Sequence, residues 1–200
     1  LGAKVLHHRS VEIAKKYNVE LVVRSSLNNS EGTIVREVCN VEKMLVSGVA
    51  GDKNVARISV MGIPDTPGKA FDLFSLLAKN KISVDIILQS IGRDGTKDIS
   101  FTLARTDLND AINVIKENLD RLGAKDVVYK EDVAKVSIVG AGMATNPGIA
   151  AMMFEAMYNA GINISMISTS EVKISVLIDE KHTEEAMNAI HDRFRLAMER

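Results

Sequence analysis

Cysteine, proline and aromatic residues are scarce in this sequence, which has one Cys, three Pro, no Trp and an aromatic content of 4%. The single cysteine, Cys39, excludes an internal disulfide and fits a reducing environment, so we expect a cytoplasmic protein. No apolar run approaches the roughly 20 residues of a membrane-spanning helix, and no charged start followed by an apolar segment indicates a signal peptide. The formal net charge of -1 gives no reason to expect nucleic acid or an anionic membrane as a partner.

The rest of the composition is that of an ordinary globular protein. The chain has 200 residues, enough for one or two compact domains, and 46% of them are hydrophobic while 26% are charged. With so few aromatic residues, its core must be aliphatic and filled by methionine. Because the first residue is Leu1 rather than Met, we expect the chain to be a piece of a longer protein.

Two parts of the chain repeat the same pattern of strand, Pro-Gly turn, helix and strand. The paired stretches are "VARISVMG" (55–62) with "VAKVSIVG" (133–140), Pro67-Gly68 with Pro147-Gly148, and "KISVDIILQS" (81–90) with "GINISMISTS" (161–170). The offset is 133 − 55 = 78 residues for the first pair and 161 − 81 = 80 for the last. The shared order and spacing indicate tandem copies of one small domain.

The first copy predicts a βαββαβ order. The expected elements are a strand at 55–62, a helix at about 67–80, strands at 82–90 and 98–104 joined by a turn at 93–96, a helix that Asp107 caps and Gly123 ends, and a strand at 126–130. In strand 82–90, alternation places Val84, Ile86 and Leu88 on one face. This order is typical of the ferredoxin-like α+β fold, an antiparallel four-stranded sheet with helices on one face.

The second copy predicts the same elements without the last strand. They are strands at 134–140, 162–168 and 172–178 and helices at 147–160 and 183–198. A sheet without its last strand leaves an open edge, so we expect the strand-like residues 42–50 to complete it. Residues 42–50 plus 132–200 would then form one domain and 51–131 another, inserted into it. Residues 1–41 fit neither copy and resemble the tail of a further domain.

The Pro-Gly turns suggest a binding site for a small zwitterion. Pro67 in the first helical turn loses no hydrogen bond, Thr66 (or Asn146 in the second copy) can cap free amides, and Gly68 leaves the backbone bare. A helix start with free N–H groups attracts a carboxylate. Asp65 would take an ammonium group, and the next strand would add Asp85 and Gln89.

A simpler interpretation is that Pro-Gly only starts a helix, and duplication alone would explain the second turn. The copies also differ at two important positions, since Asp65 corresponds to Thr145 and Gln89 to Thr169. If Asp65 anchors an amine, the first copy is the better ligand site. The second copy would then be degenerate or complete the pocket of a neighbouring subunit.

With these residues laid out, the chain resembles the C-terminal part of the aspartate kinase (aspartokinase) family. The matching stretches are "GAKVLHHRSVEIAKKYNVELVVRSSLNNSEGTIV", "VSGVAGDKNVARISVMGIPDTPGKAFDLFSLLA", "ISVDIILQS", "VSIVGAGMATNPGIAAMMFEAM" and "NISMISTSEVKISVLI". His8 is a departure, since the family usually has Pro after "KVLH". The resemblance implies two ACT domains, preceded by the end of an amino-acid kinase domain in residues 1–41.

The resemblance also implies a function. Aspartate kinase uses ATP and Mg to phosphorylate L-aspartate, the first step toward lysine, threonine and methionine, and its ACT domains bind lysine or threonine and switch it off. The nucleotide-binding part of the family is absent here, so the chain has no catalytic residues or cofactor of its own and should not turn over alone. In the family, the first copy of one subunit packs beside the second copy of another, which implies a homo-oligomer.

Effector contacts carried over from the family fall on both copies. They are Asp65, Pro67, Gly68, Lys69, Ala70, Asp85 and Gln89 from the first copy, and Asn163, Ile164, Ser168, Thr169, Ser170 and Glu171 from the second. A hairpin turn would explain the "STSE" residues equally well. The alternative function is a stand-alone amino-acid-sensing module without kinase activity. His7, His8, His182 and His191 lack the spacing of metal ligands, so no metal site is expected.

Overall fold

The computed structural model describes residues 5–35, 46–90, 92, 94–140, 143 and 146–196, with His8 and residues 195–196 described through their backbone alone. The helices are α1 (His8–Lys16), α2 (Lys69–Lys79), α3 (Leu108–Lys116), α4 (Leu119–Leu122), α5 (Ile149–Asn159) and α6 (Thr183–Leu196), with 3-10 turns η1 (Arg105–Asp107) and η2 (Glu180–His182). The strands are β1 (Leu21–Val23), β2 (Thr33–Val35), β3 (Gly48–Pro64), β4 (Val84–Gln89), β5 (Thr96–Leu103), β6 (Asp126–Val139), β7 (Met166–Thr169) and β8 (Lys173–Asp179).

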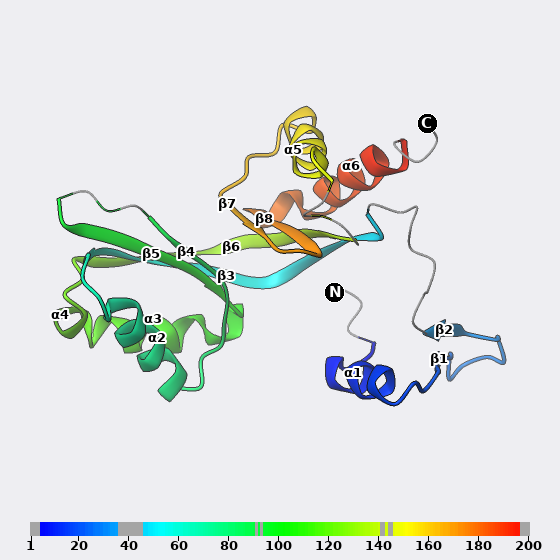
Figure 1. Cartoon of the computed structure of the whole chain (residues 1–200), viewed down its shortest axis with the longest axis horizontal. Coiled ribbons are helices and arrows are strands. Elements are labelled where there is room, and N and C mark those ends of the chain that lie inside the picture. Colours follow the sequence, from blue (N-terminus) through cyan, green and yellow to red (C-terminus); the bar gives the residue numbers. More distant parts are fainter. Residues whose placement is uncertain are drawn as a thin grey trace.

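One antiparallel sheet of six strands, in the order β4-β5-β3-β6-β8-β7, forms the centre of the molecule (Figure 1). Its two central strands, β3 and β6, pair from Gly48↔Val139 to Met61↔Asp126. The sequence predicted separate strands at 55–62, 126–130 and 134–140, and this was wrong because the β segments of the two copies run on into each other. Two separate sheets would each have two edge strands with unpaired backbone groups. Joining the sheets through continuous strands leaves only the two edges of the combined sheet.

The central strands divide the molecule into two lobes. The first lobe consists of β4, β5, α2, α3, α4 and the adjoining halves of β3 and β6, and the second of β7, β8, α5, α6 and the other halves. Each lobe therefore has four antiparallel strands and the ferredoxin-like order that the sequence predicted. The register of β3 on β6 shifts between Asp52 and Val55 and again between Val55 and Arg57. Such bulges bend and twist a strand, and they lie where the lobes meet.

The strand expected from residues 42–50 is formed in part. Residues 48–50 begin β3 and pair with β6, as required to complete the second lobe, and Ser47 donates its N–H to the Val139 carbonyl at 2.6 Å. Residues 42–45 lie outside the described residues. The assignment of whole domains to 42–50 plus 132–200 and to 51–131 stays a prediction.

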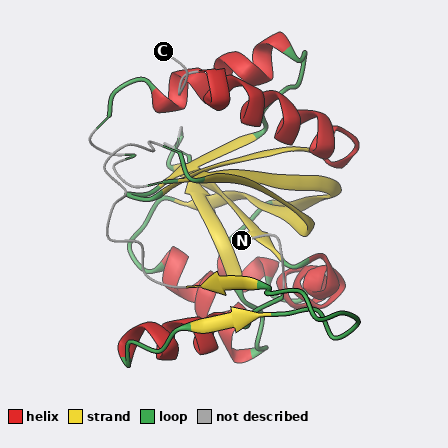
Figure 2. Cartoon of the chain, turned by 90° about the vertical axis from the view of Figure 1, so that its right-hand side faces the viewer, coloured by secondary structure: helices red, strands yellow, loops and turns green. Residues whose placement is uncertain are grey.

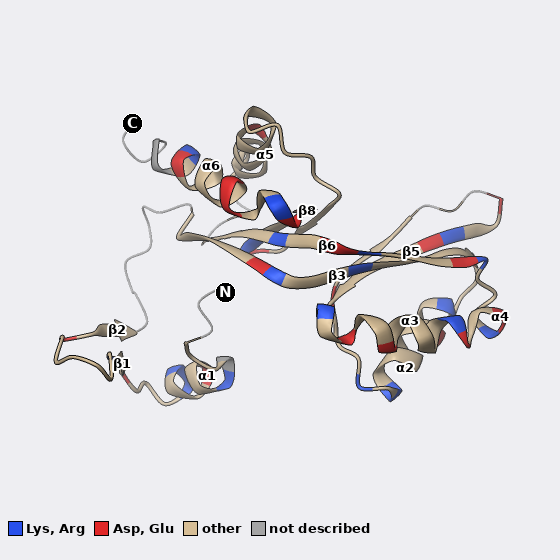
Figure 3. Ribbon diagram, turned by 180° about the vertical axis from the view of Figure 1, so that it is seen from behind, with Lys and Arg blue, Asp and Glu red and all other residues tan. Residues whose placement is uncertain are grey.

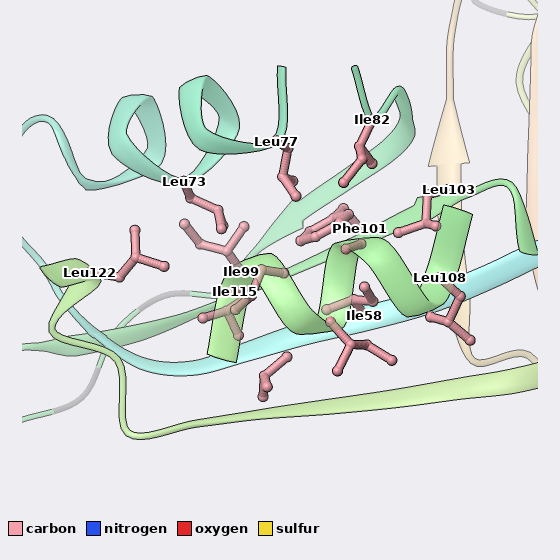
Figure 4. Packing of buried hydrophobic residues seen from close by; sticks show 14 of the residues in the cluster. Ile58, Leu73, Leu77, Ile82, Ile99, Phe101, Leu103, Leu108, Ile115 and Leu122 are labelled. Carbon is pink, nitrogen blue, oxygen red and sulfur yellow. The ribbon is translucent and has the colours of Figure 1, made fainter. Parts of the chain in front are cut away.

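The helices of the two lobes lie on opposite sides of the twisted sheet (Figure 1), and Figure 2 shows the strands between the two helical layers. Each lobe has its own core. In the first, Phe101 is fully buried among aliphatic side chains such as Leu77 and Ile99 (Figure 4). Its ring meets that of Phe74 edge-on, with 5.6 Å between the ring centroids. In the second, Met153 and Met157 fill the space under α5, as the aromatic-poor sequence predicted.

Two local details of this helical segment differ from the sequence prediction, and a third agrees with it. The helix expected after Asp107 is interrupted: α3 ends at Lys116, the Asn118 side-chain amide donates to the Val114 carbonyl at 2.9 Å, and α4 resumes at Leu119. Asp107 does not cap α3, because the preceding 3-10 turn gives it helical backbone angles. Gly123 ends the helical segment as expected, with φ at 71°.

The alternation predicted for strand 82–90 is also wrong. The register of β4 on β5 shifts between Val84 and Ile87. Val84 packs on the core of the first lobe, whereas Ile86 joins a separate cluster with Val133 and Leu177. The extra residue at this bulge reverses the faces of the residues that follow it.

Charged residues lie on the strands where the two lobes meet (Figure 3), and two ion pairs connect the lobes there. Arg105 of η1 pairs with Glu180 of η2 at 2.6 Å, and Lys130 of β6 pairs with Asp179 at the end of β8. The hydrogen bond from Lys130 lowers the pKa of Asp179 below its ordinary value and raises that of Lys130. Both side chains of this second pair are more than one-third exposed, so solvent screens it and its contribution to stability is small.

The N-terminal segment lies apart from the six-stranded sheet in Figure 1. It consists of α1 and a two-stranded antiparallel sheet of β1 and β2. No helix in the described ranges combines the length and apolar character needed to cross a membrane. The described residues also contain no group of three or more His, Cys, Asp or Glu side chains placed to bind a metal ion.

Candidate functional site

The first turns of α2 and α5 have the same unusual start. Gly68 precedes α2 with φ at 96°, and Gly148 precedes α5 with φ at 99°, a left-handed conformation that glycine adopts at little cost. Pro67 therefore stands before the helix rather than in its first turn, which corrects the sequence prediction. The predicted cap by Thr66 is not formed, since Gly68 is the N-cap residue of α2, and Gly148 rather than Asn146 precedes α5.

This start leaves backbone N–H groups of α2 open to a ligand. The first hydrogen bond within the helix runs from the Asp72 N–H to the Gly68 carbonyl at 2.9 Å. The N–H groups of Lys69, Ala70 and Phe71 come before it and have no acceptor within the helix. A methyl group built on Gly68 would meet no atom within 4 Å. The space beside Gly68 is therefore open, and the helix dipole favours an anion at these amides.

Asp65 lies beside this start and already has a partner that the sequence analysis missed. Its Oδ1 pairs with the Lys97 ammonium at 2.9 Å, and the Lys97 side chain is only 11% exposed whereas that of Asp65 is 52% exposed. A ligand ammonium would therefore share the carboxylate with Lys97. Lys97 falls between the turn predicted at 93–96 and the strand predicted at 98–104, and nothing in the sequence indicates that its side chain reaches Asp65.

Gln89 lies at the same end of the sheet as Asp65. In the ladder, Gln89 pairs with Ile99 and Pro64 pairs with Thr96, so the start of β5 lies between the end of β4 and the end of β3. The Gln89 side chain is exposed. The start of α2, Asp65 and Gln89 therefore lie at the same end of the first lobe, and their joint role in one ligand site stays a prediction.

Lys69 and Ala70 form the first turn of α2 and are half-buried. The Lys69 ammonium reaches the Arg121 carbonyl at the end of α4, at 3.5 Å. With Lys97, it places a second positive charge near the helix start. The helix start therefore has two ammonium groups near it, together with the carboxylate of Asp65 and that of Asp72 in the first turn of α2.

Asp85 is not part of this group. It is four residues before Gln89 on β4, which corresponds to about 13 Å at 3.3 Å per residue. Its carboxylate pairs with the Lys135 ammonium of β6 and lines a different cavity between the lobes.

Among the candidate residues of the second copy, residues 168–171 lie at the other end of the sheet, whereas residues 163–164 precede β7 on the side where the lobes meet. Ser168 and Thr169 end β7, and Asn163 and Ile164 precede it. Ser170 closes the hairpin, since both its N–H and its hydroxyl donate to the Lys173 carbonyl, at 2.7 and 3.3 Å, so the turn explains this residue without a ligand. Glu171 is exposed in the same turn.

The direction of the strands separates the two candidate groups within one chain. The start of α2 follows the end of β3, and the start of α5 follows the end of β6. Because β3 and β6 are antiparallel, the two helix starts lie at opposite ends of the sheet. Residues 168–171 can therefore join the group around Asp65 only if they come from another copy of the chain.

Comparison with known proteins agrees with this architecture. A family model described as "ACT domain" matches residues 58–119 and 136–194, one match in each lobe. Among curated proteins, the chain is 47% identical over 201 residues to an aspartokinase of Helicobacter pylori (strain 26695), with 98% of the chain aligned. That alignment covers 49% of the relative, so the chain spans about half the length of the curated relatives it matches.

Solved structures give the same result. The chain is 45% identical to a chain of "aspartokinase alpha and beta subunits", with a TM-score of 0.71, covering 75% of this chain and 99% of the other. It is 40% identical to the ligand-free regulatory subunit of aspartate kinase from Thermus thermophilus, with a TM-score of 0.71 and the same coverage.

Proposed function

Because this chain belongs to the ACT domain family and, within it, to the regulatory regions of aspartokinases, we propose that it binds lysine, threonine or both at the start of α2 and thereby inhibits an aspartate kinase. The observation that carries this proposal is the open helix start, whose free N–H groups lie beside Lys97 and Asp65. An amino acid presents a carboxylate to the amides and an ammonium to Asp65. Gln89 would contact the side chain of the amino acid.

The proposed site is completed by a second copy of the chain. β4 and β7 are the outer strands of the sheet, and an outer strand offers unpaired backbone groups to a partner. Pairing between the first lobe of one copy and the second lobe of another would bring Asn163, Ile164 and residues 168–171 toward the start of α2. The apolar side chains of Ile87 and Ile167, 47% and 41% exposed on these strands, would be covered by such a contact.

The parent protein would phosphorylate L-aspartate with ATP and Mg, and residues 1–41 would be the tail of its kinase domain. The N-terminal segment supports this, since large apolar side chains such as Tyr17, Val22 and Leu27 are at least half exposed there, Leu27 at 94%. An exposed apolar surface of this density is typical of a contact with another part of a protein. A stand-alone amino-acid sensor would have no use for it.

Inhibition would follow from unequal binding. If the amino acid binds one quaternary arrangement more tightly than the other, it shifts the population toward that arrangement. The kinase affinity for its substrates then changes by the same coupling free energy, typically about 1–3 kcal/mol.

Changing Asp65 to Ala is expected to weaken amino-acid binding by about 1.5–3 kcal/mol, the range for hydrogen bonds to charged groups. The ligand ammonium loses its carboxylate and instead faces Lys97. Isothermal titration calorimetry of the chain with L-lysine and with L-threonine measures this, and circular dichroism establishes that the variant folds. Asp110→Ala, an exposed carboxylate of α3 in the same lobe, is the matched control and should bind like the wild type. Unchanged dissociation constants of Asp65→Ala for both amino acids would remove Asp65 from the site.

A further inference from the structure

A cavity of about 500 Å³ lies between the two lobes, at the opposite end of β4 from Gln89. Both lobes contribute charged side chains to its wall. Asp85 and Asp107 come from the first lobe, Lys135 and Lys173 from the second, and Asp52 from β3 where the lobes meet. Its size is within the range of small-molecule sites, which commonly form at such junctions.

Among the residues that the structure describes, two charged groups in this wall have no ionic partner. Asp107 does not cap α3, and within the described part of the chain its half-buried carboxylate accepts only the hydroxyl of the adjacent Thr106, at 3.2 Å. Lys173 is half-buried at the start of β8, and its ammonium makes no hydrogen bond or ion pair with the residues that the structure describes. The cavity therefore offers one unpaired anion and one unpaired cation to a ligand.

The remaining three charges form a chain across the junction. The Lys135 ammonium, on a side chain only 11% exposed, pairs with Asp85 and lies 3.9 Å from the Asp52 carboxylate. With Asp107 and Lys173, the wall carries three carboxylates and two ammonium groups, a formal charge of 2 − 3 = −1. A ligand that balances it carries one net positive charge. The rest of the wall is partly apolar, with Leu6, Val55, Val84 and Leu103, and partly polar, with Asn54, Ser83 and Thr102.

We infer that this cavity is a second ligand site, for a small amino acid with a cationic side chain. Lys173 would bind the ligand carboxylate, the Asp52–Asp85 pair of carboxylates its α-ammonium, and Asp107 its side-chain ammonium. The methylene groups would lie against the apolar part of the wall. The inference does not depend on the site at the start of α2, because every residue it uses lies in one chain and away from that helix.

Such a ligand would bridge the lobes. Its ammonium groups would contact the first lobe and its carboxylate the second, on either side of the bulges between Asp52 and Arg57. Binding would therefore hold the two lobes in one relative arrangement.

The test uses the whole chain, with L-lysine as the cationic probe and L-norleucine, which has the same carbon chain without the terminal ammonium, as its control. Calorimetry should show one lysine bound per chain at this site, whatever the oligomeric state, and norleucine binding at least tenfold weaker. Asp107→Asn and Lys173→Met should each weaken this event at least tenfold. Asp110→Asn and Lys116→Met, exposed charges on α3, should leave it unchanged, and so should Asp65→Ala.

Amide chemical shifts of the wild type, measured by ¹⁵N NMR during the lysine titration, give a readout that needs no variant. The inference predicts shifts at Thr102 and Ala104, which line the cavity, and these shifts should persist in Asp65→Ala. Lysine binding that Asp65→Ala abolishes entirely, or that shifts neither amide, would overturn the inference while leaving the α2 site intact. Loss of the α2 site alone would leave the cavity shifts in place.

Discussion

Replacing Phe101 by Ala is expected to lower the free energy of unfolding by about 3–5 kcal/mol, the range for buried Phe→Ala substitutions. Phe101 is fully buried in β5, between the helices of the first lobe and the central strand β3, where it pairs with Ile58. Its ring also makes the edge-on contact with Phe74. The neighbours are held by β5 and by helices α2 and α3, so they can fill the cavity only in part.

Urea denaturation at one protein concentration, followed by circular dichroism, measures this loss. Phe71→Ala is the control, because it removes the same ring from a position in α2 that is 74% exposed. The control should change stability by less than about 0.5 kcal/mol, as surface substitutions usually do. Equal effects of the two substitutions would show that Phe101 is not in the core.

Replacing Met153 by Ala is expected to destabilise the second lobe by about 2–5 kcal/mol. Met153 is fully buried under α5 and belongs to the cluster that includes Ile138 and Val176 of the sheet. The effect should reach the first lobe, because β3 and β6 pass through both cores. A loss confined to the second lobe would show that the two cores unfold independently.

Amide hydrogen exchange distinguishes these outcomes. In Met153→Ala, protection should fall in β8 of the second lobe and also in β5 of the first. Tyr158→Ala is the control on the same helix, at a position that is 82% exposed. It should leave exchange in both strands unchanged, since little of its side chain is buried.

The sequence predicted the repeated unit because periodicity and turn residues are local signals. The order of strands and helices in each lobe, the end of the helical segment at Gly123 and the methionine-filled core under α5 all follow from such signals. Joining of the copies through β3 and β6 was not predicted. A strand that continues through a bulge has the same composition as two strands separated by a turn.

The reversal of faces in β4 has a similar cause. Alternation assumes a regular register, and the sequence carries no sign of the shift between Val84 and Ile87. That shift places Ile86 on the face where the lobes meet. Asp85, which the sequence assigned to an effector site with Asp65, pairs with Lys135 instead.

At the candidate site, the sequence predicted the group formed by Gly68, Asp65 and Gln89. Asp65 and Gly68 lie between the first predicted strand and its helix, and Gln89 lies at the end of the next strand, so all three are expected at the same end of a βαβ unit. It did not predict Lys97, whose ammonium reaches Asp65 from β5. Pairing between side chains of different strands depends on register, which one sequence does not reveal. The placement of the second-copy residues beside this group depends on a second chain and stays a prediction.

The start of α2 can be examined directly for binding of an amino-acid carboxylate by its free amides. Backbone ¹⁵N chemical shifts of the chain, titrated with L-threonine and separately with L-lysine, measure this. The account predicts saturable shifts of the Lys69 and Ala70 amides, and of the Gln89 side-chain amide, with at least one of the two amino acids. Saturable binding of either amino acid that leaves the Lys69 and Ala70 amides unmoved, or no binding of both at millimolar concentration, would contradict it.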